Sequence, residues 1–148
     1  MEKLIVLGII SMSVLGCANS GQPASPTRSH DPQAVVGKTW QWQDTVTPVK
    51  KIHVPQPERY TLRFDEKGHV QARFDCNRGG GSYLISEAKL SFGPMISTRM
   101  ACPENSLDNI FMKQLKDVNS FFLEGDSLYL ELPVDSGPLR FKQQADSH

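Results

Sequence analysis

Residues 59–74, which read RYTLRFDEKGHVQARF, decide the fold. Apolar and polar side chains alternate on both sides of the central DEKG, and this period of two indicates β-strands with one buried face. Gly68 can take the positive φ of a tight turn at no steric cost. The stretch therefore predicts an antiparallel hairpin, with strands at 59–64 and 70–74.

Further short strands are expected elsewhere in the chain, at 39–43, 82–85, 89–92, 120–124, 127–132 and 139–142. In the first of these, Trp40 and Trp42 fall on one face because alternate residues of a strand share a face. The proline-rich segment 44–57 is expected to be a loop or an edge. Residues 75–81 contain three consecutive glycines and are expected to form a loop, and Gly93-Pro94 is expected to end the strand before it.

One helix is predicted after Pro103, a residue suited to a first helical turn, with Glu104 at the positive end of the helix dipole. Its apolar face consists of Leu107, Ile110, Phe111, Leu115 and Val118, which recur at helical spacing. Tight turns between short strands favour antiparallel neighbours. The expected fold is therefore a curved antiparallel sheet, or a partly open barrel, of about seven strands with one helix packed on it.

The first residues predict export. An apolar run covers residues 4–15 and leads into Val14-Leu15-Gly16-Cys17. It is shorter than the roughly 20 residues that span a membrane, and it suits a signal peptide. The last four residues resemble a bacterial lipobox, which implies a signal peptide at 1–16 and a lipid on Cys17. The alternative is an ordinary secretory signal without a lipid.

The residues after Cys17 predict a flexible linker at 17–33, because they are polar and rich in proline and serine. Ala18 follows the cysteine; in the enterobacterial type of lipoprotein sorting, which this segment resembles, an aspartate there would hold the protein at the inner membrane, so the resemblance implies the periplasmic face of the outer membrane. Length and composition indicate one domain at 34–143, followed by a tail at 144–148. The formal net charge is +0, so composition offers no electrostatic case for a nucleic-acid partner.

The chain has three cysteines. If Cys17 carries a lipid, Cys76 and Cys102 remain as a pair, and paired cysteines in an oxidising compartment usually form a disulfide. Such a bond would close a loop of about 27 residues and stabilise the fold by roughly 3–4 kcal/mol. The alternatives are two free thiols or one reactive thiol.

No residue pattern predicts catalysis or metal binding. The four histidines are expected in the linker, a loop, a turn and the tail, and none forms a motif with a cysteine; they are His30, His53, His69 and His148. The cysteines lack the spacing of a zinc site. The glycine run leads into a strand rather than the helix that a phosphate loop requires. We therefore predict no catalytic residue, no metal ligand and no cofactor.

The residues around Cys76 and Cys102 resemble the META domain family, which includes the HslJ-like heat-shock lipoproteins. The matching motifs are Phe74-x-Cys76-Asn77-x-Gly79-x-x-x-Tyr83, Leu90-x-Phe92-Gly93 and Ser97-Thr98-Arg99-Met100-Ala101-Cys102-Pro103. The resemblance covers about residues 36–141. It implies an α+β domain with a strongly twisted antiparallel sheet and one helix, and an envelope protein induced by heat shock. In some members it implies novobiocin resistance, but it implies no enzyme reaction.

A disulfide between the two cysteines would bring Asn77, Arg78, Thr98 and Arg99 to one edge of the domain. This edge is a candidate for binding a partner, although these residues could equally cap turns and face solvent. The leading functional hypothesis is a non-enzymatic envelope lipoprotein, anchored through Cys17, that supports stress tolerance by binding an envelope protein. The alternatives are a carrier of a lipid or another small hydrophobic ligand inside an open barrel, since small barrels can be filled or can hold a ligand, and a thiol-dependent enzyme.

Overall fold

A computed structural model describes residues 26–134 and 136–145 of the chain. The predicted signal peptide and Cys17 lie outside the described residues. The elements are β1 (Arg28–Ser29), η1 (Pro32–Ala34), β2 (Thr39–Val46), β3 (Lys51–His53), η2 (Pro57–Arg59), β4 (Tyr60–Phe64), β5 (His69–Phe74), β6 (Asn77–Ser86), β7 (Lys89–Ser97), α1 (Asp108–Lys116), β8 (Ser120–Glu124), β9 (Ser127–Glu131) and β10 (Leu139–Gln143).

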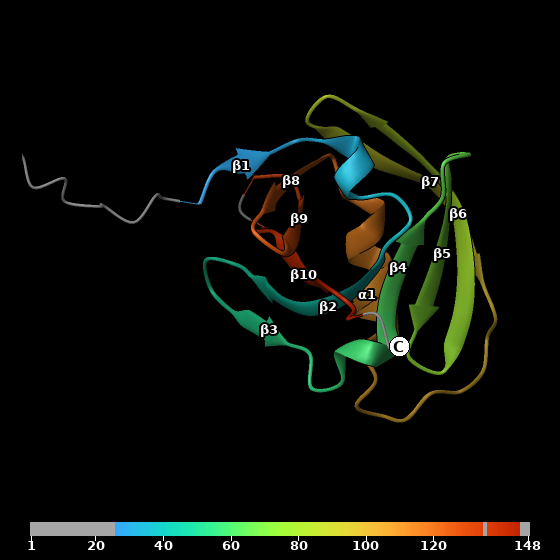
Figure 1. Cartoon of the computed structure of the whole chain (residues 1–148). Coiled ribbons are helices and arrows are strands. Elements are labelled where there is room, and N and C mark those ends of the chain that lie inside the picture. Colours follow the sequence, from blue (N-terminus) through green and yellow to red (C-terminus); the bar gives the residue numbers. More distant parts are fainter. Residues whose placement is uncertain (1–25, 135, 146–148) are drawn as a thin grey trace, which may run out of the picture.

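The ten strands form one antiparallel sheet in the order β1-β8-β9-β10-β2-β4-β5-β6-β7, with β3 paired to β2. The sheet curls around α1, which lies inside the curve (Figure 1). The sheet stays open, because among the described residues β7 pairs only with β6 and no ladder closes the order from β7 back to β1 or β8. One hydrogen bond, from the Phe121 N–H to Ala88 O at 2.9 Å, joins β8 to the β6–β7 turn. The predicted α+β class, open antiparallel sheet and single helix are confirmed, but the sheet has ten strands rather than about seven.

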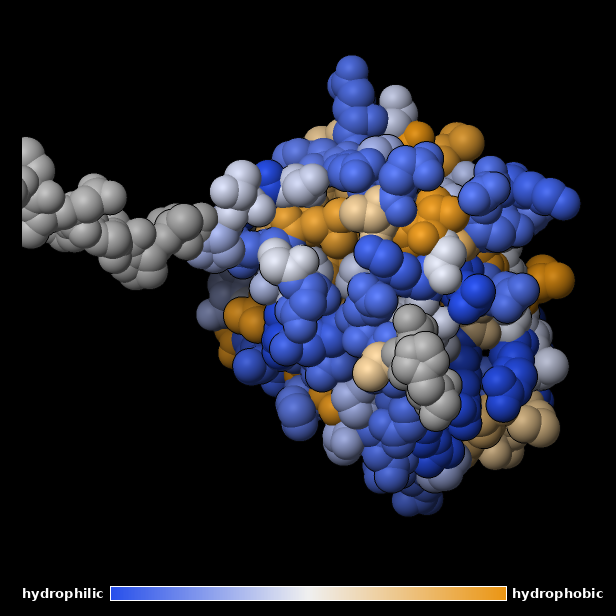
Figure 2. Space-filling model, in the orientation of Figure 1, coloured by the Kyte–Doolittle hydropathy of each residue, from blue (hydrophilic) through white to orange (hydrophobic). Residues whose placement is uncertain are grey.

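Aromatic side chains fill the space between the sheet and α1. Phe111 of α1 is fully buried and stacks on Trp42 with ring centroids 4.8 Å apart. Tyr60, Phe74 and Phe141 surround the same ring at 5.7–6.0 Å. Rings at these separations add to the stability that burial of their area provides. Figure 2 shows a mostly hydrophilic surface with hydrophobic residues in separate patches, as expected when most apolar side chains are buried in the core.

The predicted hairpin is present. β4 and β5 pair in register from Tyr60↔Phe74 to Phe64↔Val70, and Gly68 has φ +82° in the turn between them. Trp40 and Trp42 both face the core, as the alternation predicted. Both predictions rested on the alternation of apolar and polar residues along a single strand or hairpin, and this alternation was sufficient to place these side chains.

The expected loop at 75–81 is wrong, because Gly79, Gly80 and Gly81 belong to β6. A Cβ on Gly79 would lie 1.9 Å from Ile96 O, and one on Gly80 would lie 2.3 Å from Val70 O. The run of glycines lets the neighbouring strands approach more closely than any side chain would permit. These glycines therefore permit the pairing of β6 with its neighbours and do not interrupt the strand.

The expected end of a strand at Gly93-Pro94 is also wrong, since β7 continues to Ser97. Pro94 is tolerated because β7 is the last strand of the sheet, and an edge strand can lose one backbone donor. The pairing of β6 with β7 shifts register between Gly81 and Tyr83, which indicates a bulge or irregularity.

The helix begins later than expected, at Asp108 rather than near Pro103. Residues 103–107 form turns and loop instead, and the Leu107 N–H donates to the Tyr60 hydroxyl at 2.9 Å. Phe111 and Leu115 are buried as predicted, but Ile110 is 41% exposed. The helical face towards the core is therefore narrower than the sequence suggested.

Part of the segment predicted as linker is ordered. β1 pairs with the end of β8, and Asp31 caps η1 by accepting from the Gln33 N–H at 2.9 Å. Arg28 also lies over the Phe122 ring at 4.2 Å. Within the described residues, no helix has the length and apolar character needed to cross a membrane.

Candidate functional site

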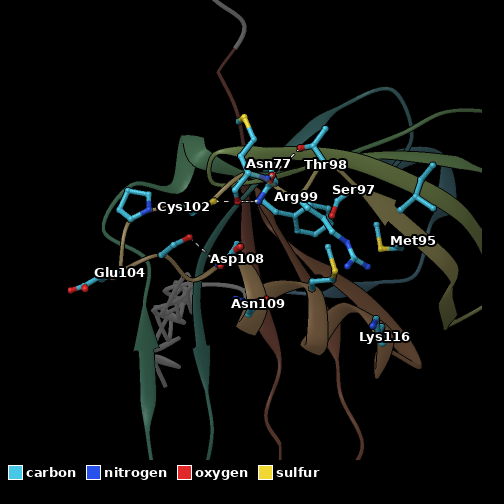
Figure 3. A pocket seen from close by; sticks show the side chains of 17 residues that line it. Asn77, Met95, Ser97, Thr98, Arg99, Cys102, Glu104, Asp108, Asn109 and Lys116 are labelled. Carbon is cyan, nitrogen blue, oxygen red and sulfur yellow. Dashed lines mark hydrogen bonds between the residues drawn. The ribbon is translucent and has the colours of Figure 1, made fainter.

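A cleft of about 870 Å³ opens between the end of β7, the loop at 98–107 and α1. We call it the β7–α1 cleft. It lies beside the edge strand of the sheet, where Met95 and Ser97 come from β7 and Asp108, Asn109 and Lys116 come from α1 (Figure 3). Within the described residues, β7 has only β6 as a paired strand, so its outer edge is free of a ladder along the cleft.

Asn77 holds the loop that forms one wall of this cleft. Its Oδ1 accepts from Thr98 Oγ1 at 2.9 Å and from the Met100 N–H at 2.8 Å. Its Nδ2 donates to Met100 O at 3.2 Å and to Cys102 Sγ at 3.3 Å. Asn77 is only 5% exposed. A single buried amide therefore satisfies both backbone groups of Met100 and positions the neighbouring loop.

A disulfide joins Cys76 to Cys102, with their Cα atoms 5.6 Å apart. The predicted pairing is confirmed. Because Cys76 precedes Asn77 and Cys102 follows the Met100 segment, the covalent bond and the amide hydrogen bonds hold the same stretch of chain. Neither sulfur is a free thiol in this arrangement, so neither can act as a nucleophile without first being reduced.

The cleft carries charges of both signs. Arg99 and Lys116 contribute two cationic groups, and Glu104 and Asp108 contribute two carboxylates. Figure 3 places Glu104 and Lys116 at opposite ends of the view, with Asp108 between them. Such a distribution favours a ligand that has polar groups of both signs rather than a simple anion or cation.

Methionines supply much of the apolar surface of the cleft: Met95, Met100 and Met112 all line it. Methionine is unbranched and polarisable, so it adapts to ligands of different shape. The sequence did not point to Met95, Met112 or Lys116 as site residues, because they come from a strand and a helix that are brought together only by the fold.

The four residues of the predicted partner-binding edge are divided between two surfaces. Asn77, Thr98 and Arg99 line the β7–α1 cleft. The backbone N–H of Arg78 donates to Thr98 Oγ1 at 3.1 Å, but the residue itself borders a separate groove on the outer face of the sheet. Thr98 and Asn77 satisfy each other, so Arg99 is the member of the set with an exposed charged side chain in the cleft.

The most buried carboxylate with a resolved pKa shift lies away from the cleft. Asp44 is 3% exposed and pairs with Arg140, while Lys51 Nζ lies 3.5 Å from its Oδ2. Burial raises the pKa of Asp44, but the hydrogen bonds and charges of Arg140 and Lys51 outweigh burial and lower the pKa overall. This group stabilises the β2–β10 pairing.

Across residues 26–134 and 136–145, no three His, Cys, Asp or Glu side chains come together in a group that could hold a metal ion. The bonded cysteines also have no histidine among the residues of the cleft. The described part of the molecule thus offers a cleft for binding, and its chemistry is that of methionine, amide and isolated charged groups.

Comparison with known proteins fits this fold. The family model of the META domain matches residues 33–146. The chain belongs to the META domain family. The resemblance noted around Cys76 and Cys102 is therefore confirmed. No curated protein matches the chain.

Three solved structures share the fold. An NMR structure of a protein from Burkholderia xenovorans is 23% identical and has a TM-score of 0.65, covering 84% of this chain and 98% of its own. A second NMR structure is 23% identical with a TM-score of 0.57, covering 76% and 93%. The crystal structure of a DUF4847 family protein from Bacteroides vulgatus is 11% identical with a TM-score of 0.56, covering 78% and 98%. At these identities the likeness concerns the fold alone.

Proposed function

We propose that this META domain protein is a lipid-anchored, non-enzymatic component of the bacterial envelope that supports tolerance of heat or antibiotic stress by binding another envelope component. The observation that carries the binding proposal is the β7–α1 cleft of about 870 Å³. A ligand site of this volume falls in the ordinary range of roughly 300–1,000 Å³. Its rim is held by Asn77 and the Cys76–Cys102 bond, so a partner meets a wall that is already ordered.

The anchoring part of the proposal rests on the lipobox-like residues that end in Cys17. It is tested by feeding cells radiolabelled palmitate and isolating the protein and its Cys17→Ser variant. Label in the natural chain and none in the variant supports the anchor. Equal labelling of the two would remove it, and the domain would then be an exported protein without a lipid.

The non-enzymatic part of the proposal is supported against one alternative, a thiol-dependent enzyme, because such a mechanism needs a free thiolate and both cysteines of the domain are bonded. Turnover of a defined substrate by the purified chain, lost on a single substitution in the cleft, would contradict this part. The carrier hypothesis is also less well supported, because α1 and buried aromatic rings occupy the inside of the curved sheet.

The binding site is tested with a photo-crosslinking amino acid placed at Met100, which is 59% exposed in the cleft, and at Val49, which is exposed outside it. Crosslinks in intact cells should form at position 100 and disappear when Arg99→Glu is added. The matched charge reversal Lys89→Glu lies outside the residues of the cleft and should leave the crosslinks unchanged. Identical crosslinks from positions 49 and 100 would contradict a site in the cleft.

A further inference from the structure

Three arginines gather on the outer face of the sheet, away from the β7–α1 cleft. Arg63 lies on β4, Arg73 on β5 and Arg78 on β6, and all three border one groove of about 310 Å³. We call this the arginine groove. It shares no lining residue with the β7–α1 cleft. Any ligand of this groove is therefore independent of the proposed function.

The register of the sheet places these charges next to one another. Arg73 pairs directly with Arg78 across β5 and β6. Arg63 pairs with Gln71, two residues from Arg73 on the same face of β5, and is therefore its diagonal neighbour. Like charges directly opposite on neighbouring strands destabilise a sheet. The groove therefore contains one directly opposite pair of like charges, Arg73 with Arg78, and one diagonal pair, Arg63 with Arg73.

No carboxylate offsets the repulsion. Among the described residues, Arg28, Arg59 and Arg140 each form an ion pair with an acidic side chain, whereas none of the three groove arginines does. No acidic residue lines the groove. The chain has as many Asp and Glu residues as Lys and Arg residues, 16 of each. The local excess of positive charge is thus a matter of placement rather than composition.

Two of the three guanidinium groups have hydrogen bonds that orient them without neutralising them. Arg73 donates from Nε to Asp75 O at 3.1 Å and from Nη1 to Glu58 O at 3.3 Å. Arg63 donates from Nη1 to Thr39 Oγ1 at 3.4 Å. These acceptors are neutral, so the positive charges remain available to an anion.

Neutral polar groups complete the groove. Thr39, Thr61 and Gln71 line it together with the arginines and supply hydroxyl and amide hydrogen-bond donors. Arginine binds phosphate through paired N–H donors, and it does so more strongly than neutral donors do. The volume of the groove is at the lower end of the range for small-ligand sites, roughly 300–1,000 Å³.

We propose that the arginine groove binds a phosphomonoester or diphosphate group, carried either by a soluble molecule or by a lipid headgroup. The bound phosphate oxygens face Arg63, Arg73 and Arg78, and they remove the repulsion that the empty groove bears. Arg63 and Arg78 are exposed and contribute charge directly. Arg73 is half-buried, and its contacts with two backbone carbonyls hold it in position.

The test titrates the full chain, in non-ionic detergent, with two probes by calorimetry. Inorganic pyrophosphate represents a soluble ligand, and short-chain phosphatidic acid, with short-chain phosphatidylcholine as its control, represents a lipid headgroup. Saturable binding of either phosphate probe at about 0.15 M salt is expected. A preference for pyrophosphate identifies a soluble ligand, and a preference for phosphatidic acid identifies a lipid. No saturable binding of either probe overturns the proposal.

The matched variants separate a site from a general charge effect. Arg63→Gln with Arg78→Gln should weaken binding by about tenfold or more, because two charge-assisted contacts are lost. Lys89→Gln with Lys113→Gln removes the same charge elsewhere and should change the affinity by no more than about twofold. Equal weakening in both double variants would overturn the proposal, since binding would then follow net charge.

A measurement of thermal or urea unfolding shows whether weaker binding by a variant results from a loss of folding rather than from the loss of a phosphate contact. Arg78→Gln relieves the repulsion from Arg73, so its unfolding midpoint in the absence of ligand should equal or exceed that of the natural chain. Pyrophosphate should raise the midpoint of the natural chain more than that of this variant. A variant that unfolds earlier without ligand would assign Arg78 a structural role and would contradict the proposal.

Discussion

Asn77 is the buried side chain whose removal should test most directly how the wall of the β7–α1 cleft is held. Asn77→Ala deletes three conventional hydrogen bonds, two accepted from Thr98 and Met100 and one donated to Met100 O, together with a weak bond donated to Cys102 Sγ. A net contribution of about 1 kcal/mol per bond would suggest a loss of roughly 3 kcal/mol. Water can reach the exposed loop and replace part of this, so we expect the free energy of unfolding to fall by about 2–3 kcal/mol.

Asn77→Asp separates the contribution of the amide oxygen, which accepts hydrogen bonds, from that of the amide nitrogen, which donates them. The carboxylate keeps the two accepted bonds but sets an acceptor against Met100 O, where the natural residue donates. Repulsion of this kind should cost about 1–3 kcal/mol at neutral pH and raise the pKa of the new carboxyl group in the folded state. Protonation restores a donor, so the deficit relative to the natural chain should shrink as the pH falls below that raised pKa.

Unfolding by urea, followed by tryptophan fluorescence, measures both changes. Trp40 and Trp42 are 1% and 0% exposed, so unfolding will alter their emission strongly. Ser91→Ala on the outer face of β7 is the control and should change the free energy of unfolding by less than about 0.5 kcal/mol. If Asn77→Ala also costs less than about 0.5 kcal/mol, the amide does not hold the loop and the reasoning is refuted.

Three further predictions concern other parts of the fold. Replacing both Cys76 and Cys102 by serine should lower the free energy of unfolding by about 3.5 kcal/mol, and reducing agent should then have no further effect on a urea titration. Gly79→Ala should destabilise the chain by about 2 kcal/mol or more, because the added Cβ would lie 1.9 Å from a backbone oxygen of β7; an unchanged urea midpoint would contradict the close strand approach. Arg140→Met should cost roughly 2 kcal/mol at neutral pH by leaving Asp44 with Lys51 as its remaining partner. Because the pKa of Asp44 is lowered in the folded state, this stabilisation is present above its ordinary value of 3.8 and is lost as the pH falls further, so the two proteins should converge in acid.

The errors made from the sequence have a common cause. Pro103 and Glu104 satisfy the local rules for starting a helix, yet α1 begins at Asp108. The disulfide and the Asn77 hydrogen bonds hold the preceding loop elsewhere, and no local pattern contains that information. Similarly, three consecutive glycines predict a loop when only the chain itself is considered. They lie in β6, where carbonyl groups of β5 and β7 approach the backbone of β6 so closely that only residues without a side chain fit.

The two proposed binding surfaces also depend partly on local sequence patterns and partly on tertiary packing. Alternation along the hairpin is enough to place Arg63 and Arg73 on its outer face, but their proximity to Arg78 depends on the pairing of β5 with β6. The β7–α1 cleft depends on packing between elements that are not neighbouring strands, because Met95 and Lys116 come together only once the sheet has curled around the helix.

The sequence by itself determined the hairpin at 59–74, the buried tryptophan face, the cysteine pair and the family. Each of these depends on spacing between residues that are near in the chain or on a motif that can be read directly. Only the tertiary structure decided the ten-stranded sheet, the glycine-lined strand, the start of α1, the β7–α1 cleft and the arginine groove. These depend on which distant segments pack together, and packing of that kind is set by the burial of the whole core rather than by any local run of residues.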